Sequence, residues 1–170
     1  MDSILTKRIE VQEKNIGALV QLLFSNDSIK RQEARRELVK IGKPAINFLV
    51  GLQYLSQKQV SWEAIKTLSE MAHPDCIPIL INALENEDTN IRWLAAEGLI
   101  KVGRPSLMPV LEVLEERADS KLLRESVHHV LKGLKENGHF TDDHDLIKVL
   151  EDPSKHIVLA PTAAMIRMKM

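Results

Sequence analysis

The stretch NIRWLAAEGLIKVGRP, residues 90–105, decides the fold because closely related stretches recur along the chain. IKRQEARRELVKIGKP at residues 29–44 and QVSWEAIKTLSEMAHP at residues 59–74 align with it without a gap. In each copy the apolar residues follow the i, i+4, i+7 spacing that starts at Ala95 here, as on the buried face of an α-helix. A recurring amphipathic helix predicts a tandem repeat in which each unit covers its neighbour.

Each copy is bounded by signals for a tight turn into a further helix. Gly42 and Gly103 come just after the last apolar position, where a helix often ends on a residue with positive φ. Pro105, like the prolines at the equivalent positions, stops one helix and can begin the next. Asp27 and Asp88 precede the recurring helices and are expected to cap their N-termini. One unit is therefore predicted to be an apolar helix, a turn with aspartate, and the recurring helix.

The whole chain is predicted to be one all-α repeat domain. A fourth copy places Val127, Leu131 and Leu134 in the three apolar positions. From the N-terminus, the predicted segments are a polar cap (1–14), four repeats (15–42, 43–72, 73–103 and 104–136), a connector (137–144) and a degenerate C-terminal repeat (145–170).

The degenerate repeat is expected to keep the order of the others, with its first helix in 145–153 and its second in 156–170. Met165 then takes the leucine position of the second helix, and Pro161 falls where alanine is expected. Proline breaks a turn inside a helix. The last helix is therefore expected to begin near Ala160, with Pro161 at its first position.

The stretch DTNIRWLAAEGLIKVGRPSLMPVL, residues 88–111, resembles the HEAT-like repeats of phycobilisome-lyase type found in many bacterial and archaeal proteins. The resemblance covers residues 16–135 well and the tail more weakly. It implies a right-handed α-α superhelical solenoid of about five HEAT-like helix pairs, with the second helix of each pair on the concave side. It also implies a ladder of caps and ion pairs from Asp–Arg pairs such as Asp88 and Arg92, which Ser61 interrupts in the second repeat.

Composition narrows the function classes. The formal net charge is −1, so a nucleic-acid partner is disfavoured, because phosphate neutralisation normally requires a basic surface. Cys76 is the single cysteine, which excludes an internal disulfide and favours the cytoplasm. The polar N-terminus and the lack of a long apolar run predict neither a signal peptide nor a membrane span. Since no catalytic motif or cofactor-binding motif is visible, we expect neither an enzyme nor a cofactor.

Two tryptophans are the leading candidates for partner binding. Trp62 and Trp93 hold the same position in adjacent repeats, roughly opposite the buried stripe. Exposed tryptophans often dominate interface energetics, although tryptophan at this position can also serve packing alone. The tryptophan position is occupied in the four repeats by Gln32, Trp62, Trp93 and Glu125. The position one turn further along each helix is occupied by Arg36, Lys66, Glu97 and His129. These eight candidate residues form a predicted ridge that changes from basic to acidic along the array.

Two features near the C-terminus are weighed as well. Met165, Ile166 and Met168 suggest an apolar edge, which either closes the core or serves self-association, because the ends of a solenoid must be covered. The connector contains several side chains of metal-binding type, namely His139, Asp142, Asp143, His144 and Asp145. They lack a recognised ligand spacing, so a solvated connector is expected in place of a metal site.

These observations favour a non-catalytic scaffold or adaptor whose partner is another protein, bound on the concave surface. The alternative is an accessory protein of bilin-lyase type that acts on a partner subunit, as the family resemblance allows. A DNA-binding HEAT-like protein is the third hypothesis, disfavoured by the charge and by Glu97 in the predicted groove.

Overall fold

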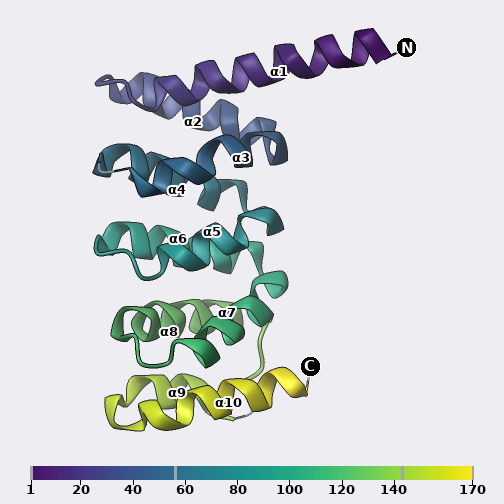
Figure 1. Cartoon of the computed structure of the whole chain (residues 1–170). Coiled ribbons are helices and arrows are strands. Elements are labelled where there is room, and N and C mark those ends of the chain that lie inside the picture. Colours follow the sequence, from purple (N-terminus) through teal and green to yellow (C-terminus); the bar gives the residue numbers. More distant parts are fainter. Residues whose placement is uncertain (1, 56, 143, 170) are drawn as a thin grey trace.

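The computed structural model describes residues 2–55, 57–142 and 144–169. In these residues it contains ten α-helices, three short 3-10 helices and no strand (Figure 1). The α-helices are α1 (Asp2–Leu22), α2 (Ser28–Ile41), α3 (Lys43–Val50), α4 (Lys58–Met71), α5 (Ile77–Ala83), α6 (Thr89–Val102), α7 (Arg104–Glu116), α8 (Lys121–Glu136), α9 (Leu146–Glu151) and α10 (His156–Met168). The 3-10 helices are η1 (Gly51–Tyr54), η2 (Pro74–Cys76) and η3 (Pro153–Lys155). The predicted all-α class is confirmed.

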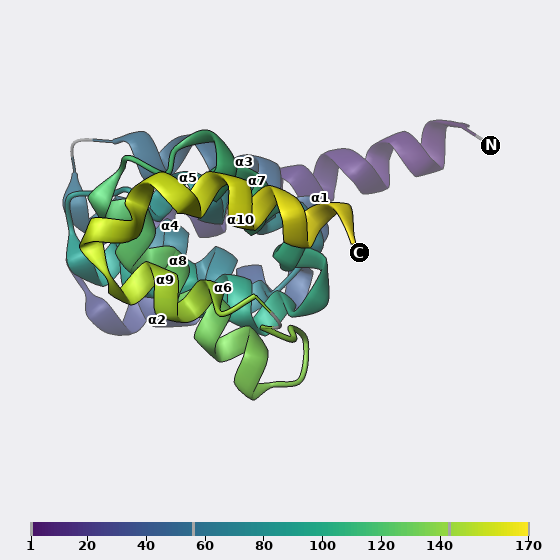
Figure 2. The ribbon, with the colours of Figure 1, turned by 90° about the horizontal axis from the view of Figure 1, so that it is seen from below.

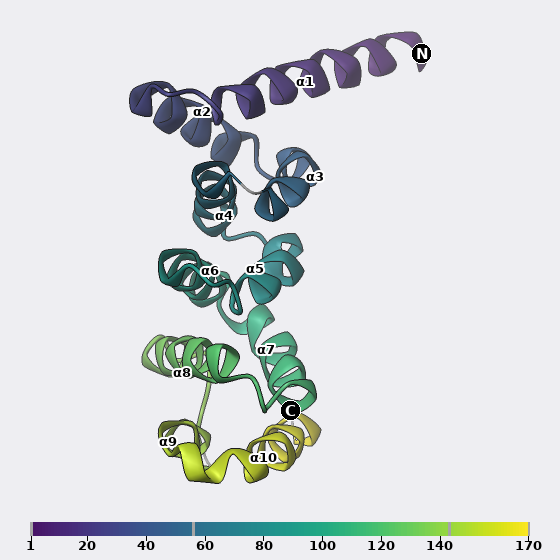
Figure 3. The ribbon, with the colours of Figure 1, turned by 60° about the vertical axis from the view of Figure 1, so that its left-hand side comes forward.

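The helices form two layers, as Figure 3 shows. The recurring helices α2, α4, α6 and α8 pack side by side in sequence order, and we call them the second-helix layer. The apolar helices α1, α3, α5 and α7 form the first-helix layer beside it. The core lies between the layers, because each helix buries one stripe and no unit can cover its stripe alone.

The predicted repeat register is confirmed by burial. Ala64, Leu68, Ala95 and Leu99 are completely buried in the second-helix layer. Truncating such a leucine would leave a cavity between the layers. The first two apolar positions of a repeat therefore hold the layers together, while the third, as at Val102, is partly buried against the core.

The predicted turn chemistry is confirmed too. Gly42 and Gly103 have φ values of 70° and 76°, in the region that favours glycine. Oδ1 of Asp27 accepts a hydrogen bond from N–H of Ile29 (2.9 Å), and Oδ1 of Asp88 caps α6 in the same way. These caps and turns set where each helix begins and ends.

The arginines that follow these aspartates have other partners than the aspartates: both bind the preceding turn, and Arg31 also pairs with Glu63 of the next repeat (2.9 Å). Arg92 Nη1 donates to the carbonyl of Asn86 (2.8 Å) in the preceding turn, and Arg31 does the same in its own repeat. Ser61 stands where the second repeat lacks the arginine, and its Oγ donates to the carbonyl of Gln53 (2.8 Å). Serine therefore replaces arginine in binding the turn, and the series is not interrupted there.

Helix α1 joins the predicted cap to the first repeat. It runs without a break across residue 14, where a boundary was expected. Side chains 10–15 are all exposed, and the first buried side chain that the structure describes is Ile16. The N-terminal half of α1 thus extends beyond the body of the array (Figure 2).

The last helix pair reverses the predicted order of layers. α9 packs against α8 in the second-helix layer, while α10 packs along α7 in the first-helix layer (Figure 3). The expectation that 145–153 would be a first helix and 156–170 a second helix is therefore wrong. The stretch that differs from the regular repeats is the one before α9: α7 starts two residues after α6 ends, whereas α9 starts ten residues after Glu136, the last residue of α8. This longer connector lets the chain turn back so that α9 packs beside α8, and α10 then crosses to the other layer.

The register within α10 also differs from the prediction. α10 begins at His156 and keeps Pro161 inside it, so the expected start near Ala160 is wrong. Leu159, Ala163 and Ile166 form the buried i, i+4, i+7 stripe. Met165, expected at the leucine position, is instead exposed, because packing on α7 turns a different face of the helix inward.

Candidate functional site

A shallow groove of about 180 Å³ lies between α6 and α8 on the outer side of the second-helix layer. Its most prominent side chain is Trp93, which is 54% exposed. The lining residues are Thr89, Arg92, Trp93 and Ala96 from α6 and Glu125, Ser126 and His129 from α8.

Repeat geometry creates this groove. Trp93 lies one residue before Leu94 and two before Ala95, both of which turn into the core. Ala96 offers only a methyl group at the floor, so the surface stays hollow between the indole and α8. Ser126 closes the floor from the other side, with its Oγ bound to the carbonyl of Leu84 (2.8 Å). The groove is therefore set by packed helices and not by a loose loop.

The polar rim of the groove is held by specific contacts. His129 Nε2 lies 2.8 Å from Oε1 of Glu97, so two predicted residues of adjacent repeats meet directly. Glu125 lies within 3.7 Å of the Lys121 ammonium, one turn earlier on α8. Arg92 is occupied by backbone carbonyls of the preceding turn. The rim thus carries both signs of charge around an exposed indole.

Trp62 behaves differently from its counterpart in the next repeat. Its ring is partly buried and packs against the hydrophobic core. The guanidinium of Arg35 lies 5.7 Å from the ring centroid, which is within cation–π range. The structure therefore assigns Trp62 to the α2–α4 contact and leaves Trp93 as the exposed indole of the predicted pair.

The remaining members of the predicted ridge are spread along the layer. Gln32 and Arg36 are exposed on α2. Lys66 Nζ lies 3.3 Å from Oε1 of Glu70 on the same helix. Trp93, Glu125 and His129 of the ridge line this groove, and Glu97 adjoins it through His129.

Sequence reasoning missed several residues of this region. Thr89, Ala96 and Ser126 line the groove without having been singled out, and Arg92 had been assigned only to the expected ladder of caps and ion pairs. Arg35 was missed as well, although its position one turn after Arg31 could have indicated that it faces the next repeat. Which residues line the groove therefore depends on the neighbouring helix, and a pattern along one helix does not show it.

The residues of the predicted C-terminal apolar edge differ in exposure. Met165 and Met168 are exposed, at 45% and 87%, whereas Ile166 is buried against the core. The exposed face of α10 also carries Ile157, at a spacing that places it on the same side as both methionines. This face is the surface to which the self-association hypothesis applies.

The connector side chains of metal-binding type have separate contacts. Asp142 accepts hydrogen bonds from the N–H groups that begin α9, and Asp145 pairs with Lys148 (2.9 Å). His144 contacts Lys169, while Asp143 lies outside the described residues. Across the described part of the chain, no three His, Cys, Asp or Glu side chains are grouped so as to hold a metal ion.

The thiol of Cys76 is buried, and the resulting desolvation raises its pKa to about 11. Because the thiolate is the reactive form, such a thiol is a poor nucleophile near neutral pH. A packing role fits this environment.

The described residues also contain no helix that is long and apolar enough to span a membrane.

Comparison with known proteins bears on the kind of repeat. A family model described as HEAT repeats matches residues 52–132, just under half of the chain, so this region is similar to HEAT repeats. The match does not distinguish the phycobilisome-lyase type. No curated protein matches the chain.

Two solved structures are similar over most of the chain. One is the crystal structure of an engineered protein, 18% identical, covering 88% of this chain and 76% of that one, with a TM-score of 0.42. The other is a designed armadillo repeat protein in complex with the peptide (KR)4, 19% identical, with coverages of 86% and 79% and a TM-score of 0.41. At these TM-scores neither similarity carries an argument about function.

Proposed function

We propose that this HEAT-repeat array is a non-catalytic scaffold or adaptor that binds another protein through its second-helix layer, with Trp93 as the anchor. The observation that carries the proposal is an indole more than half exposed at the edge of a preformed groove. Exposed tryptophans in such positions supply a large share of binding energy when a partner covers them. The single buried cysteine agrees with a cytoplasmic location.

The contacts around the groove define the partner further. The indole and Ala96 offer an apolar surface for one side chain of a bound segment. The Glu97–His129 pair, Glu125 and Arg92 place charge of both signs beside it. We therefore expect a peptide segment with an apolar anchor residue flanked by charged residues.

The test uses a random peptide display library panned on the full chain alone. Selected peptides are expected to carry an apolar residue flanked by charged residues and to lose roughly ten-fold or more in affinity for Trp93→Ala. Because the indole is largely exposed, this variant should keep its fold, which circular dichroism checks.

Tyr54→Ala is the matched control, since Tyr54 is an exposed aromatic residue of η1, in another part of the array. It should leave the affinity of the selected peptides unchanged. Equal losses in Trp93→Ala and Tyr54→Ala, or peptides that bind Trp93→Ala as well as the parent, would contradict the proposal.

The finer resemblance to phycobilisome-lyase-type repeats supports a second proposal, an accessory role with a bilin on a partner subunit. Visible absorbance of the protein after incubation with free bilin tests it. A bilin spectrum unchanged by the protein would count against that role.

A further inference from the structure

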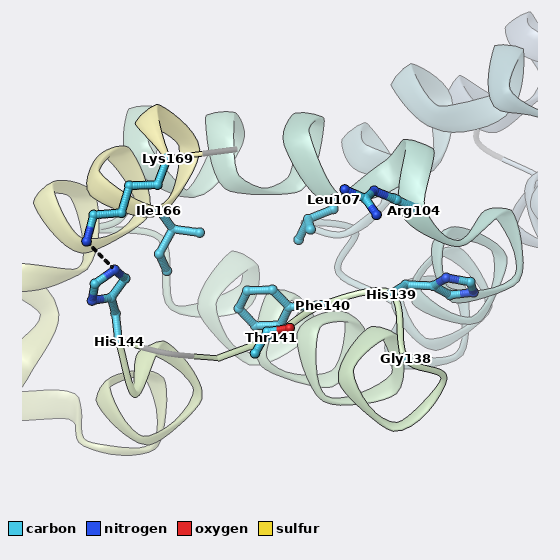
Figure 4. A pocket seen from close by; sticks show the side chains of 9 residues that line it. All are labelled: Arg104, Leu107, Gly138, His139, Phe140, Thr141, His144, Ile166 and Lys169. Atoms are coloured by element: carbon cyan, nitrogen blue, oxygen red, sulfur yellow. Dashed lines mark hydrogen bonds between the residues drawn. The ribbon is translucent and has the colours of Figure 1, made fainter.

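A cavity of about 240 Å³ lies at the C-terminal end of the array, separate from the Trp93 groove. It is enclosed by the start of α7, the connector after α8 and the end of α10 (Figure 4). Its floor is apolar, formed by the buried side chains of Leu107, Phe140 and Ile166. The cavity depends on the reversed order of the last pair, because this order places α10 beside α7.

Both ends of this cavity are basic. Arg104 and His139 lie at one end, and Lys169 and His144 lie at the other (Figure 4). Lys169 Nζ is 3.1 Å from Nε2 of His144, which must accept the hydrogen bond because an ammonium group only donates. Among the residues that the structure describes, no aspartate or glutamate lines the cavity. Asp142, close by in sequence, is buried and bound to the N–H groups that begin α9.

The basic wall near α7 is fixed by backbone geometry. Gly138 has a φ of 72° and ends α8, which turns the chain back so that N–H of His139 donates to the carbonyl of Leu134 (2.8 Å). The imidazole then lies directly over Gly103, where an added Cβ would be 3.0 Å from Nε2. His139 is therefore held beside the first turn of α7.

We propose that this cavity binds a small organic anion, consisting of a carboxylate or phosphate group on an apolar body. The apolar floor receives the body, and Arg104 with His139, or Lys169 with His144, pairs with the acidic group. The cavity is smaller than the pockets of drug-sized ligands, so the ligand is a small metabolite-like molecule. This site is independent of protein binding at Trp93.

Phenyl phosphate is the probe, titrated into the full chain while amide NMR shifts of Gly103 and Gly138 are followed. We expect saturable shifts at these glycines, and tighter binding than for inorganic phosphate or for neutral benzyl alcohol. Arg104→Gln or Lys169→Gln, whichever removes the charged donor that pairs with the phosphate, should weaken phenyl phosphate binding roughly ten-fold. Both side chains are exposed, so these variants should fold.

Lys30→Gln is the matched control, because it removes the same charge from an exposed site on α2 at the other end of the array. Its affinity for phenyl phosphate should equal that of the parent. The proposal is overturned if Lys30→Gln weakens binding as much as the more damaging of Arg104→Gln and Lys169→Gln, since the attraction would then be non-specific. It is also overturned if inorganic phosphate binds as tightly as phenyl phosphate, or if the two glycine amides do not shift.

Discussion

The α2–α4 and α4–α6 contacts join equivalent helices of neighbouring repeats, but one is ionic and the other apolar. Glu63 and Leu94 hold the same repeat position, just before the buried alanine, and both are buried. The Glu63 carboxylate is only 4% exposed and accepts a hydrogen bond from Nε of Arg31 (2.9 Å) and a second from Arg35. At the α4–α6 contact, Leu94 supplies apolar surface at that position, and the tight approach is made at Gly98.

The difference follows from the place of each contact in the array. α2 is the first helix of the second-helix layer, so Arg31 and Arg35 on it keep part of their hydration while they neutralise Glu63. A buried carboxylate is tolerated only with such partners. In the interior, α6 has neighbours on both sides, and apolar packing avoids that desolvation cost. The repeats are therefore alike in backbone but not interchangeable in sequence.

The largest effect is expected for a substitution in the core beneath the apolar α4–α6 contact. Leu99→Ala should lower the free energy of unfolding by about 2–5 kcal/mol, because it leaves a cavity between the layers at a completely buried site. Urea unfolding followed by circular dichroism measures the change. Leu22→Ala, at a partly exposed leucine of α1, should cost far less. An unchanged midpoint for Leu99→Ala would mean that the repeat register is misplaced.

The next effect tests the ionic contact. Glu63→Gln should lower the free energy of unfolding by about 2–3 kcal/mol, because Arg31 and Arg35 lose the charge that compensates their burial. Glu33→Gln is the matched control, since Glu33 has the same repeat position on α2 but is exposed. It should change stability by less than about 0.5 kcal/mol. Equal losses in the two variants would show that the buried network contributes nothing specific.

The regular part of the fold could be predicted from sequence because three periodic signals agree there. The buried stripe of Ala95 and Leu99, the glycine at 103 and the capping Asp88 all point to the same helix boundaries. The last pair could not be predicted in this way. Its layer order depends on which neighbour each helix packs against, and an apolar period alone does not specify the neighbour.

The candidate site was predictable only in part for a similar reason. The position of Trp93 opposite the buried stripe correctly suggested exposure. The same argument failed for Trp62, because Arg35 on the preceding helix covers its ring. The basic cavity needed three segments far apart in sequence, represented by Arg104, His139 and Lys169, so no local pattern could indicate it.

The smallest expected effect sharpens the description of the α4–α6 contact as a close approach. A Cβ on Gly98 would lie 2.9 Å from Cα of Ser69 and 2.8 Å from Cδ1 of Leu80, so Gly98→Ala must push α6 away from α4. We expect the free energy of unfolding to fall by about 1–2 kcal/mol, because the cost of overpacking exceeds the gain from the better helix propensity of alanine. Gly17→Ala is the control, because nothing lies within 4 Å of that Cβ in α1. The Gly17→Ala variant should have a free energy of unfolding about 0.5–1 kcal/mol higher than the parent. If both alanines stabilise the protein in urea unfolding, then the two helices are not in tight contact at Gly98, and the contrast with the ionic α2–α4 contact loses its basis.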